Sequence, residues 1–263
     1  RHRRVLYSVA NDKDCLSSLP GLKPLRERLL YRYGITKADK IVVQTRKQQH
    51  LLQTEFGQAS KVIPMPCQGV DSLHYNRATN RRNGDPLKVL WIGRFANQKR
   101  LEWLLDLAAI CPEVQFNVLG GANTETNYSS MLKFRAESLS NVTLHGRVKH
   151  SEISKFYQTS DILCCTSTHE GFPNVFLEAW SLGIPIVTTF DPDDVVKTYG
   201  IGIVASNVDE LKCGIFSLSK IELWEQASMA AKKYFEQFHR VESSMKLFSE
   251  EIRELMDEKP KVQ

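Results

Sequence analysis

Two glutamates in the stretch "THEGFPNVFLEAW" (168–180) have the clearest potential for chemistry. Glu170 precedes a Gly-Phe-Pro-Asn turn, and Glu178 follows in an apolar run that predicts a buried helix. A carboxylate in such a helix needs hydrogen-bond donors, which sugar hydroxyls would supply, and a ribose diol would suit Glu178. An ion pair for Glu178 and a helix-dipole contact for Glu170 explain the two residues equally well at this point.

The turn between the glutamates is suited to phosphate. Gly171 frees the backbone, Pro173 fits a first helical turn, and Asn174 can cap the helix. The start of a helix presents unpaired N–H groups and a positive dipole end to an anion. The turn therefore predicts an anion site.

A second loop, "GRFANQKR" (93–100), carries Arg94 and Lys99 directly after a predicted strand. An arginine can clamp phosphate oxygens bidentately and a lysine adds a point charge. Alone, these residues are better explained as solvated surface cations. The "GG" pair at 120–121 permits close approach of a ligand, or equally a tight turn.

Short β-branched runs alternate with helical patterns along the whole chain, which predicts an α/β fold with doubly wound parallel sheets. Ligands in such folds bind at the carboxyl ends of strands, where these loops lie. Strands are expected at 4–10, 40–44, 61–66, 88–93, 114–120, 142–146, 161–167, 185–189 and 200–205. Helices are expected at 25–38, 46–56, 101–110, 128–138, 151–160 (capped by Ser151), 174–183, 221–237 and 241–256.

The polar, aperiodic stretch 67–86 predicts a linker between two domains. Residues 1–66 would form part of an N-terminal Rossmann-like domain whose opening strands are missing, and 87–238 a complete second domain.

Two weaker motifs do not indicate a function. "GIGIVA" (200–205) resembles a dinucleotide fingerprint but reads as a strand, so no nicotinamide cofactor is expected. Asp191 and Asp193 form a D-x-D that is more typical of a turn than of a metal site.

Charge is distributed unevenly. Residues 1–86 hold 16 Lys+Arg against 7 Asp+Glu, a net of +9, within a chain whose total is +5. The basic part could contact an anionic lipid surface, although a solvated face is the slightly better explanation. Nucleic acid is not expected, because no recognition motif accompanies the charge.

The six cysteines lack metal-ligand spacing, and no apolar run is long enough to span a bilayer. We therefore expect a cytoplasmic protein that could also lie at the inner membrane surface.

The segments "GRFANQK", "HGRV" and "EISKFYQTSDILCCTSTHEGFPNVFLEAWSLGIPIVTT" resemble the retaining glycosyltransferases of family four, the "glycosyl transferases group 1". The resemblance implies a GT-B fold, with a donor-binding domain at 87–238 and a final helix at 239–263 that returns to the N-terminal domain. It covers essentially the whole chain and is strongest over 88–205.

The resemblance also implies roles for individual residues. Arg94 and Lys99 would bind the donor pyrophosphate, Glu170 the transferring sugar as the catalytic contact, and Glu178 the ribose. The backbone of the phosphate cradle would come from Gly171, Phe172, Pro173, Asn174 and Val175, and the nucleobase loop from Gly146, Arg147 and Val148. Transfer would need no metal and no cofactor besides the nucleotide-sugar donor.

Three functions remain open from the sequence. The first is a retaining glycosyltransferase that acts on a saccharide or lipid-linked acceptor. The second is a truncated remnant that binds a nucleotide sugar without transferring it, because the family's N-terminal Gly-rich turn is missing. The third is a sugar-nucleotide isomerase, which the "EGFPNVFLEA" context makes less favoured.

Overall fold

The computed structural model describes residues 3–70 and 85–257, which form two compact units. Unit 1 comprises residues up to Gln68, the short segment Glu170–Pro173 and the chain from Gln237 onward, and unit 2 the remainder. Most of the expected linker, 71–84, lies outside the described residues. The placement of 170–173 in unit 1 differs from the sequence-based boundaries, which put the whole motif in the donor-binding domain.

Unit 2 is built on a six-stranded parallel sheet with the strand order β6-β5-β4-β7-β8-β9. The strands are β4 (Lys88–Ile92), β5 (Gln115–Leu119), β6 (Val142–Gly146), β7 (Ile162–Cys165), β8 (Ile186–Thr188) and β9 (Gly202–Val204). This is the order of a dinucleotide-binding doubly wound domain, so the predicted fold class is confirmed for this unit. "GIGIVA" contains β9 itself, as expected.

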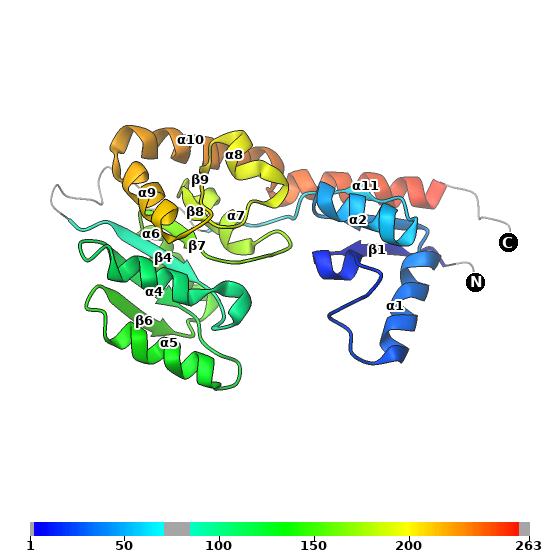
Figure 1. Cartoon of the computed structure of the whole chain (residues 1–263). Coiled ribbons are helices and arrows are strands. Elements are labelled where there is room, and N and C mark those ends of the chain that lie inside the picture. The colour runs from blue at the N-terminus through cyan, green and yellow to red at the C-terminus, as the bar shows by residue number, and fades with distance from the viewer. Residues whose placement is uncertain (1–2, 71–84, 258–263) are drawn as a thin grey trace. The chain divides into compact units, whose positions relative to one another are not determined.

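Helices cover both faces of this sheet (Figure 1). They are α4 (Leu101–Ala109), α5 (Asn127–Glu137), α6 (His150–Gln158), α7 (Asn174–Ser181), α8 (Val195–Tyr199), α9 (Val208–Ser219) and α10 (Ile221–Phe238). One core joins the sheet to α4, α5 and α9 through fully buried side chains such as Trp91, Leu104 and Ile215. Right-handed crossovers place α7 and α8 on the opposite face.

Unit 1 contains a three-stranded parallel sheet of β1 (Leu6–Val9), β2 (Lys40–Val43) and β3 (Lys61–Val62). Its helices are α1 (Leu25–Lys37), α2 (Arg46–Phe56) and α11 (Val241–Asp257). Lys40 Nζ holds α11 through Glu251 Oε2 at 2.9 Å and Glu254 Oε2 at 2.6 Å. Within the described ranges, no helix combines the length and apolar character needed to cross a bilayer.

Three local expectations were wrong or incomplete. The strand expected at 61–66 ends at Val62, because Pro64 and Pro66 have no N–H to donate. Helix α6 begins at His150 with Lys149 in the N-cap position, so Ser151 does not cap it. Helix α9 was missed, although Asn207 accepts from Glu210 N (2.8 Å) in a recognisable capping pattern.

Gly120, the residue after β5, sits where no other side chain fits. Its φ is +126°, and a Cβ there would lie 1.8 Å from the carbonyl oxygen of Gly93, the residue after β4. At Gly120 a close approach of two backbones therefore requires glycine, whether or not a ligand also lies near this residue.

We expect Gly120→Ala to lower the free energy of unfolding by about 3 kcal/mol or more, because the loops after β4 and β5 must separate. The adjacent Gly121→Ala is the matched control, since its Cβ would meet Arg147 Cγ at an ordinary 3.7 Å. Its cost should stay within about 1 kcal/mol. Urea unfolding of both variants measures the difference, and equal midpoints would contradict this account.

Candidate functional site

The strand order of unit 2 reverses between β4 and β7, and the two loops there are joined directly. Thr168 N donates to Gln98 O (2.9 Å), and Gln98 Nε2 donates to His169 O (2.5 Å). A crevice outside the carboxyl ends of the strands at this reversal is where doubly wound domains bind their ligands. The two loops that the sequence singled out therefore flank the expected binding position of the fold.

Arg94 and Lys99 lie on the first of these loops. Arg94 is exposed, and its guanidinium makes no hydrogen bond or ion pair with any residue that the structure describes. Lys99 ends the short 3-10 helix η2 (Asn97–Lys99), and its carbonyl accepts from Thr166 Oγ1 at 2.6 Å. Arg94 is thus available to an anion, while its role remains a prediction.

Arg100, the next residue, was not singled out from the sequence. Its Nε donates to Thr166 O (2.8 Å), and Nη2 donates to Thr189 Oγ1 (2.8 Å). These contacts tie the loop after β4 to the loops after β7 and β8. The sequence carries no signal for this role, because the partners are 66 and 89 residues away.

Glu178 is the fifth residue of α7, on a helix whose Phe176, Leu177, Ala179 and Trp180 are fully buried, as expected. Its Oε2 accepts from the hydroxyl of Tyr157 on α6 at 2.7 Å. The ion pair considered from the sequence is not formed with any described residue; the partner is this neutral tyrosine. The hydroxyl of Tyr157 therefore orients the carboxylate and leaves its second oxygen to accept from a ligand.

The motif residues Glu170–Pro173 group with unit 1. A Cβ on Gly171 would lie 2.4 Å from Ala10 O, so this position requires glycine through close packing. The ring of Phe172 lies 4.8 Å from that of His239. Burial lowers the pKa of His239 to about 4, so the ring is neutral and its Nδ1–H donates to Met65 O (2.9 Å). Helix α7 begins at Asn174, so Asn174 is the first helical residue and not the residue before the helix, as a cap would be. Pro173 precedes the helix and does not lie in its first turn.

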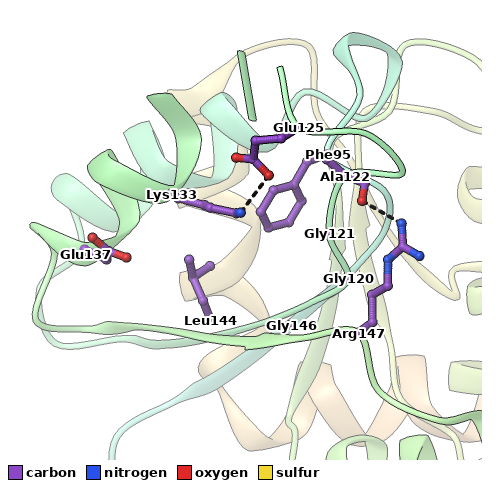
Figure 2. Close-up of a pocket in the computed structure, with 10 residues that line it drawn as sticks. All are labelled: Phe95, Gly120, Gly121, Ala122, Glu125, Lys133, Glu137, Leu144, Gly146 and Arg147. Atoms are coloured by element: carbon purple, nitrogen blue, oxygen red, sulfur yellow. Dashed lines mark hydrogen bonds and ion pairs between the residues drawn. The ribbon is translucent and has the colours of Figure 1, made fainter. Parts of the chain in front are cut away.

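A pocket of about 360 Å³ lies at the carboxyl ends of β5 and β6 (Figure 2). Gly120, Gly121, Gly146 and Arg147 form its backbone side, and Phe95 projects into it. Arg147 Nη2 donates to Ala122 O at 2.5 Å, and Lys133 pairs with Glu125 at 2.9 Å on the other side. Gly146 and Arg147 of the expected nucleobase loop thus line a pocket of ligand size, whereas Val148 is not among its lining residues; the role of the loop remains a prediction.

The D-x-D pair behaves as a turn. Asp191 Oδ1 and Oδ2 accept from Val196 N (2.8 Å) and Lys197 N (3.2 Å), which caps the start of α8. Burial raises the pKa of Asp191, and the two amide donors oppose that shift. Asp193 and Asp194 both adopt left-handed backbone, which forms the tight turn that leads into α8.

The sequence model of the family described as "Glycosyl transferases group 1" matches residues 75–237, more than half of the chain. This chain belongs to that family. The predicted family, inferred from the residues around Glu170 and Glu178, is confirmed.

Curated relatives of the chain include the "UDP-N-acetylglucosamine--peptide N-acetylglucosaminyltransferase GtfA subunit" of Streptococcus pneumoniae. The two are 26% identical over 169 residues, which cover 60% of this chain and 32% of that protein. The mannosylfructose-phosphate synthase of Agrobacterium fabrum is 29% identical over 182 residues, 62% of this chain and 39% of that protein. The chain therefore spans about a third of the length of such relatives.

Solved structures with the same fold include Anabaena Alr3699/HepE in complex with UDP, with a TM-score of 0.78 and 19% identity. The match covers 96% of this chain and 72% of that one. Pneumococcal GtfA in complex with UDP and GlcNAc gives a TM-score of 0.65 and 21% identity over 87% of this chain and 47% of that one. These likenesses show that the GT-B fold expected from the sequence is correct.

We expect Tyr157→Phe to weaken binding of a nucleoside diphosphate, the ligand that the motifs predict, about fivefold, because Glu178 loses the donor that orients it. Unfolding free energy should change by no more than about 1.5 kcal/mol. Tyr128→Phe is the matched control, since it removes a tyrosine–glutamate hydrogen bond to Glu102 elsewhere in unit 2. Titration calorimetry on both variants decides, and equal affinities would show that Tyr157 does not orient Glu178.

Proposed function

We propose that the chain is the donor-binding part of a glycosyltransferase that moves a sugar, with retention and without a metal, from a nucleotide-diphosphate sugar. The acceptor would be a saccharide or a lipid-linked saccharide. The observation that carries the proposal is the reversal of strand order between β4 and β7, with a cationic loop on one strand and the glutamate motif after the other.

The residues divide the donor between them. Arg94 and Lys99 would neutralise the diphosphate, the Gly171–Val175 backbone would cradle it, and Glu178 would accept from the ribose hydroxyls. Glu170 would contact the transferring sugar, and the Gly146–Val148 loop would hold the base beside the pocket at β5 and β6. All of these side chains act by binding or orienting their ligand.

Stabilisation of the leaving diphosphate would supply the catalysis. Negative charge grows on the diphosphate as the bond to the sugar breaks, and fixed cations and amide dipoles lower the energy of that state. The departing phosphate oxygen would take the proton of the attacking acceptor hydroxyl on the same face. No protein nucleophile is required, and configuration at the sugar carbon is retained.

UDP is the first ligand to test, because the solved complexes of Anabaena HepE and pneumococcal GtfA contain UDP. Arg94→Ala and Glu178→Ala should each weaken UDP binding about tenfold or more, through loss of a charge-assisted contact. EDTA should leave the affinity unchanged. Calorimetry with the two variants tests the site.

Lys220→Ala, which changes a lysine after α9, is the control and should bind like the wild type. Unchanged UDP affinity in both Arg94→Ala and Glu178→Ala would contradict the assignment of these residues to the donor site. UDP affinity that is lost in EDTA and restored by Mn²⁺ would contradict metal-independent binding and indicate a metal site at Asp191 and Asp193. Tight UDP binding without transfer in any acceptor assay would favour a binding remnant.

Peripheral contact with an anionic membrane surface is a further part of the proposal, and helix α1 of unit 1 is the surface that would make it. Its outward face exposes Leu25 (71%), Leu29 (59%), Leu30 (59%) and Tyr33 (65%). The inward face is fixed by the fully buried Ile35 and the rest of the unit 1 core. Four large apolar side chains on one short helix form a patch that water solvates poorly.

Basic residues are interleaved with this apolar face. Residues 23–37 hold five Lys+Arg and one Asp+Glu, a net of +4. Arg26 and Lys37, which lie alongside Tyr33 and Leu30, have no partner among the described residues. Apolar insertion with surrounding cations is the pattern of helices that lie at an anionic bilayer surface. Helix α11 of the same unit also exposes apolar residues, but its 241–257 stretch holds two Lys+Arg against five Asp+Glu, which anionic lipid would repel.

We expect the protein to bind phosphatidylglycerol vesicles more tightly than phosphatidylcholine vesicles, in a salt-dependent manner. The pair Leu29→Gln and Tyr33→Gln should weaken this binding about tenfold through lost apolar insertion. The pair Met245→Gln and Met256→Gln on α11 is the control and should have no effect. Vesicle sedimentation measures both. Equal binding to the two lipids, or self-association that disappears in the α1 pair, would contradict membrane contact and leave donor binding untouched.

A further inference from the structure

Arg100 has a backbone conformation that favours glycine. Its φ of 45° and ψ of 51° lie in the left-handed region, where a Cβ is disfavoured, and it is the residue that starts α4. Glycine or asparagine would adopt this conformation at lower cost. An arginine here must therefore contribute through its side chain.

The guanidinium of Arg100 is held through Nε, Nη2 and one ring face. Besides its bonds to Thr166 O and Thr189 Oγ1, its Cζ lies 3.8 Å above the centre of the Trp103 ring. Thr189 Oγ1 in turn donates to Ser167 O at 2.9 Å. One planar group thus fixes three loops that leave neighbouring strands β4, β7 and β8.

The charge of Arg100 has no carboxylate partner. All of its hydrogen-bond acceptors are neutral, and no acidic group among the described residues forms an ion pair with it. The carboxylate of Glu102, which accepts from the hydroxyl of Tyr128, acts on Arg100 through space and opposes the effect of burial on its pKa. Burial lowers the pKa of Arg100, but a guanidinium stays charged at neutral pH. The protein therefore keeps a half-buried, hydrogen-bonded cation where its strand order reverses.

We propose that Arg100 is a positioning residue for the diphosphate of the donor. It sets the spacing between the loops that carry Arg94–Lys99 and Thr168–His169, and its charge, which forms no ion pair among the described residues, would attract the anion that these loops are proposed to bind. The inference rests on the proposed function for its ligand, but the loop spacing is a property of the protein alone.

The test compares Arg100→Gly, Arg100→Lys and the control Arg135→Gln, which removes an arginine that links α5 to Asp106 at 2.7 Å in the same unit. Glycine keeps the left-handed backbone and removes the side chain; lysine keeps the charge and loses the forked geometry. Calorimetry gives the affinities for UDP and for uridine. Hydrogen exchange gives the protection of the Thr168 and Thr189 amides without ligand.

We expect Arg100→Gly to lose about tenfold in UDP affinity but little in uridine affinity, since only the diphosphate senses the charge. Amide protection at Thr168 and Thr189 should fall in both Arg100 variants, while Arg100→Lys should regain part of the UDP affinity. Arg135→Gln should match the wild type. Unchanged exchange in Arg100→Gly, or equal losses for UDP and uridine, would overturn the proposal.

Failure of the wild type to bind UDP, GDP or ADP would instead remove the proposed function. The exchange data would still show whether Arg100 fixes the loops.

Discussion

The reversal of strand order between β4 and β7 is the constraint on which the candidate site depends. Chain leaving β4 turns to one side of the sheet toward β5, and chain leaving β7 turns to the other toward β8. No crossover helix closes the position between them, so both loops remain at one edge. Hydrogen bonds from Gln98 and Arg100 then hold these loops at a fixed spacing.

Around this position, some side chains are available to a ligand and others hold the neighbouring loops or side chains in place. Arg94 is exposed and makes no side-chain hydrogen bond or ion pair with the described residues, whereas Arg100 donates through Nε and Nη2 to carbonyl and hydroxyl oxygens. Two arginines six positions apart therefore differ in their structural roles: the side chain of one is available to a ligand, and that of the other connects the loops after β4, β7 and β8. The same division applies to Glu178 and Tyr157, because the tyrosine hydroxyl orients a carboxylate that is left with an open oxygen.

Local sequence patterns predicted the elements well, because periodicity and turn residues act over a few positions. The amphipathic stretch 46–56 is α2, and the unbroken apolar runs at 161–167 and 185–189 contain the buried strands β7 and β8. Site residues that act through distant partners could not be found in this way. Tyr157 appears in sequence as an ordinary helical aromatic residue, and Arg100 as one more cation in a polar loop. Only folding brings Tyr157 to Glu178 or Arg100 to Thr189. The strand expected at 61–66 is too long for a local reason, because Pro64 and Pro66 lack the N–H groups that would continue the pairing.

The contact between Gly93 and Gly120 has a consequence for how ligand preference can change. Gly120 contributes only main chain to the pocket lining, because Gly93 O leaves no room for a side chain there, while Phe95, Glu125, Lys133 and Arg147 contribute side chains. This part of the lining therefore stays main chain whatever residues surround it. Substitutions at the four side chains can then change the shape and charge of the pocket without moving the loops after β4 and β5, which in the proposed function would let base preference vary separately from phosphate binding.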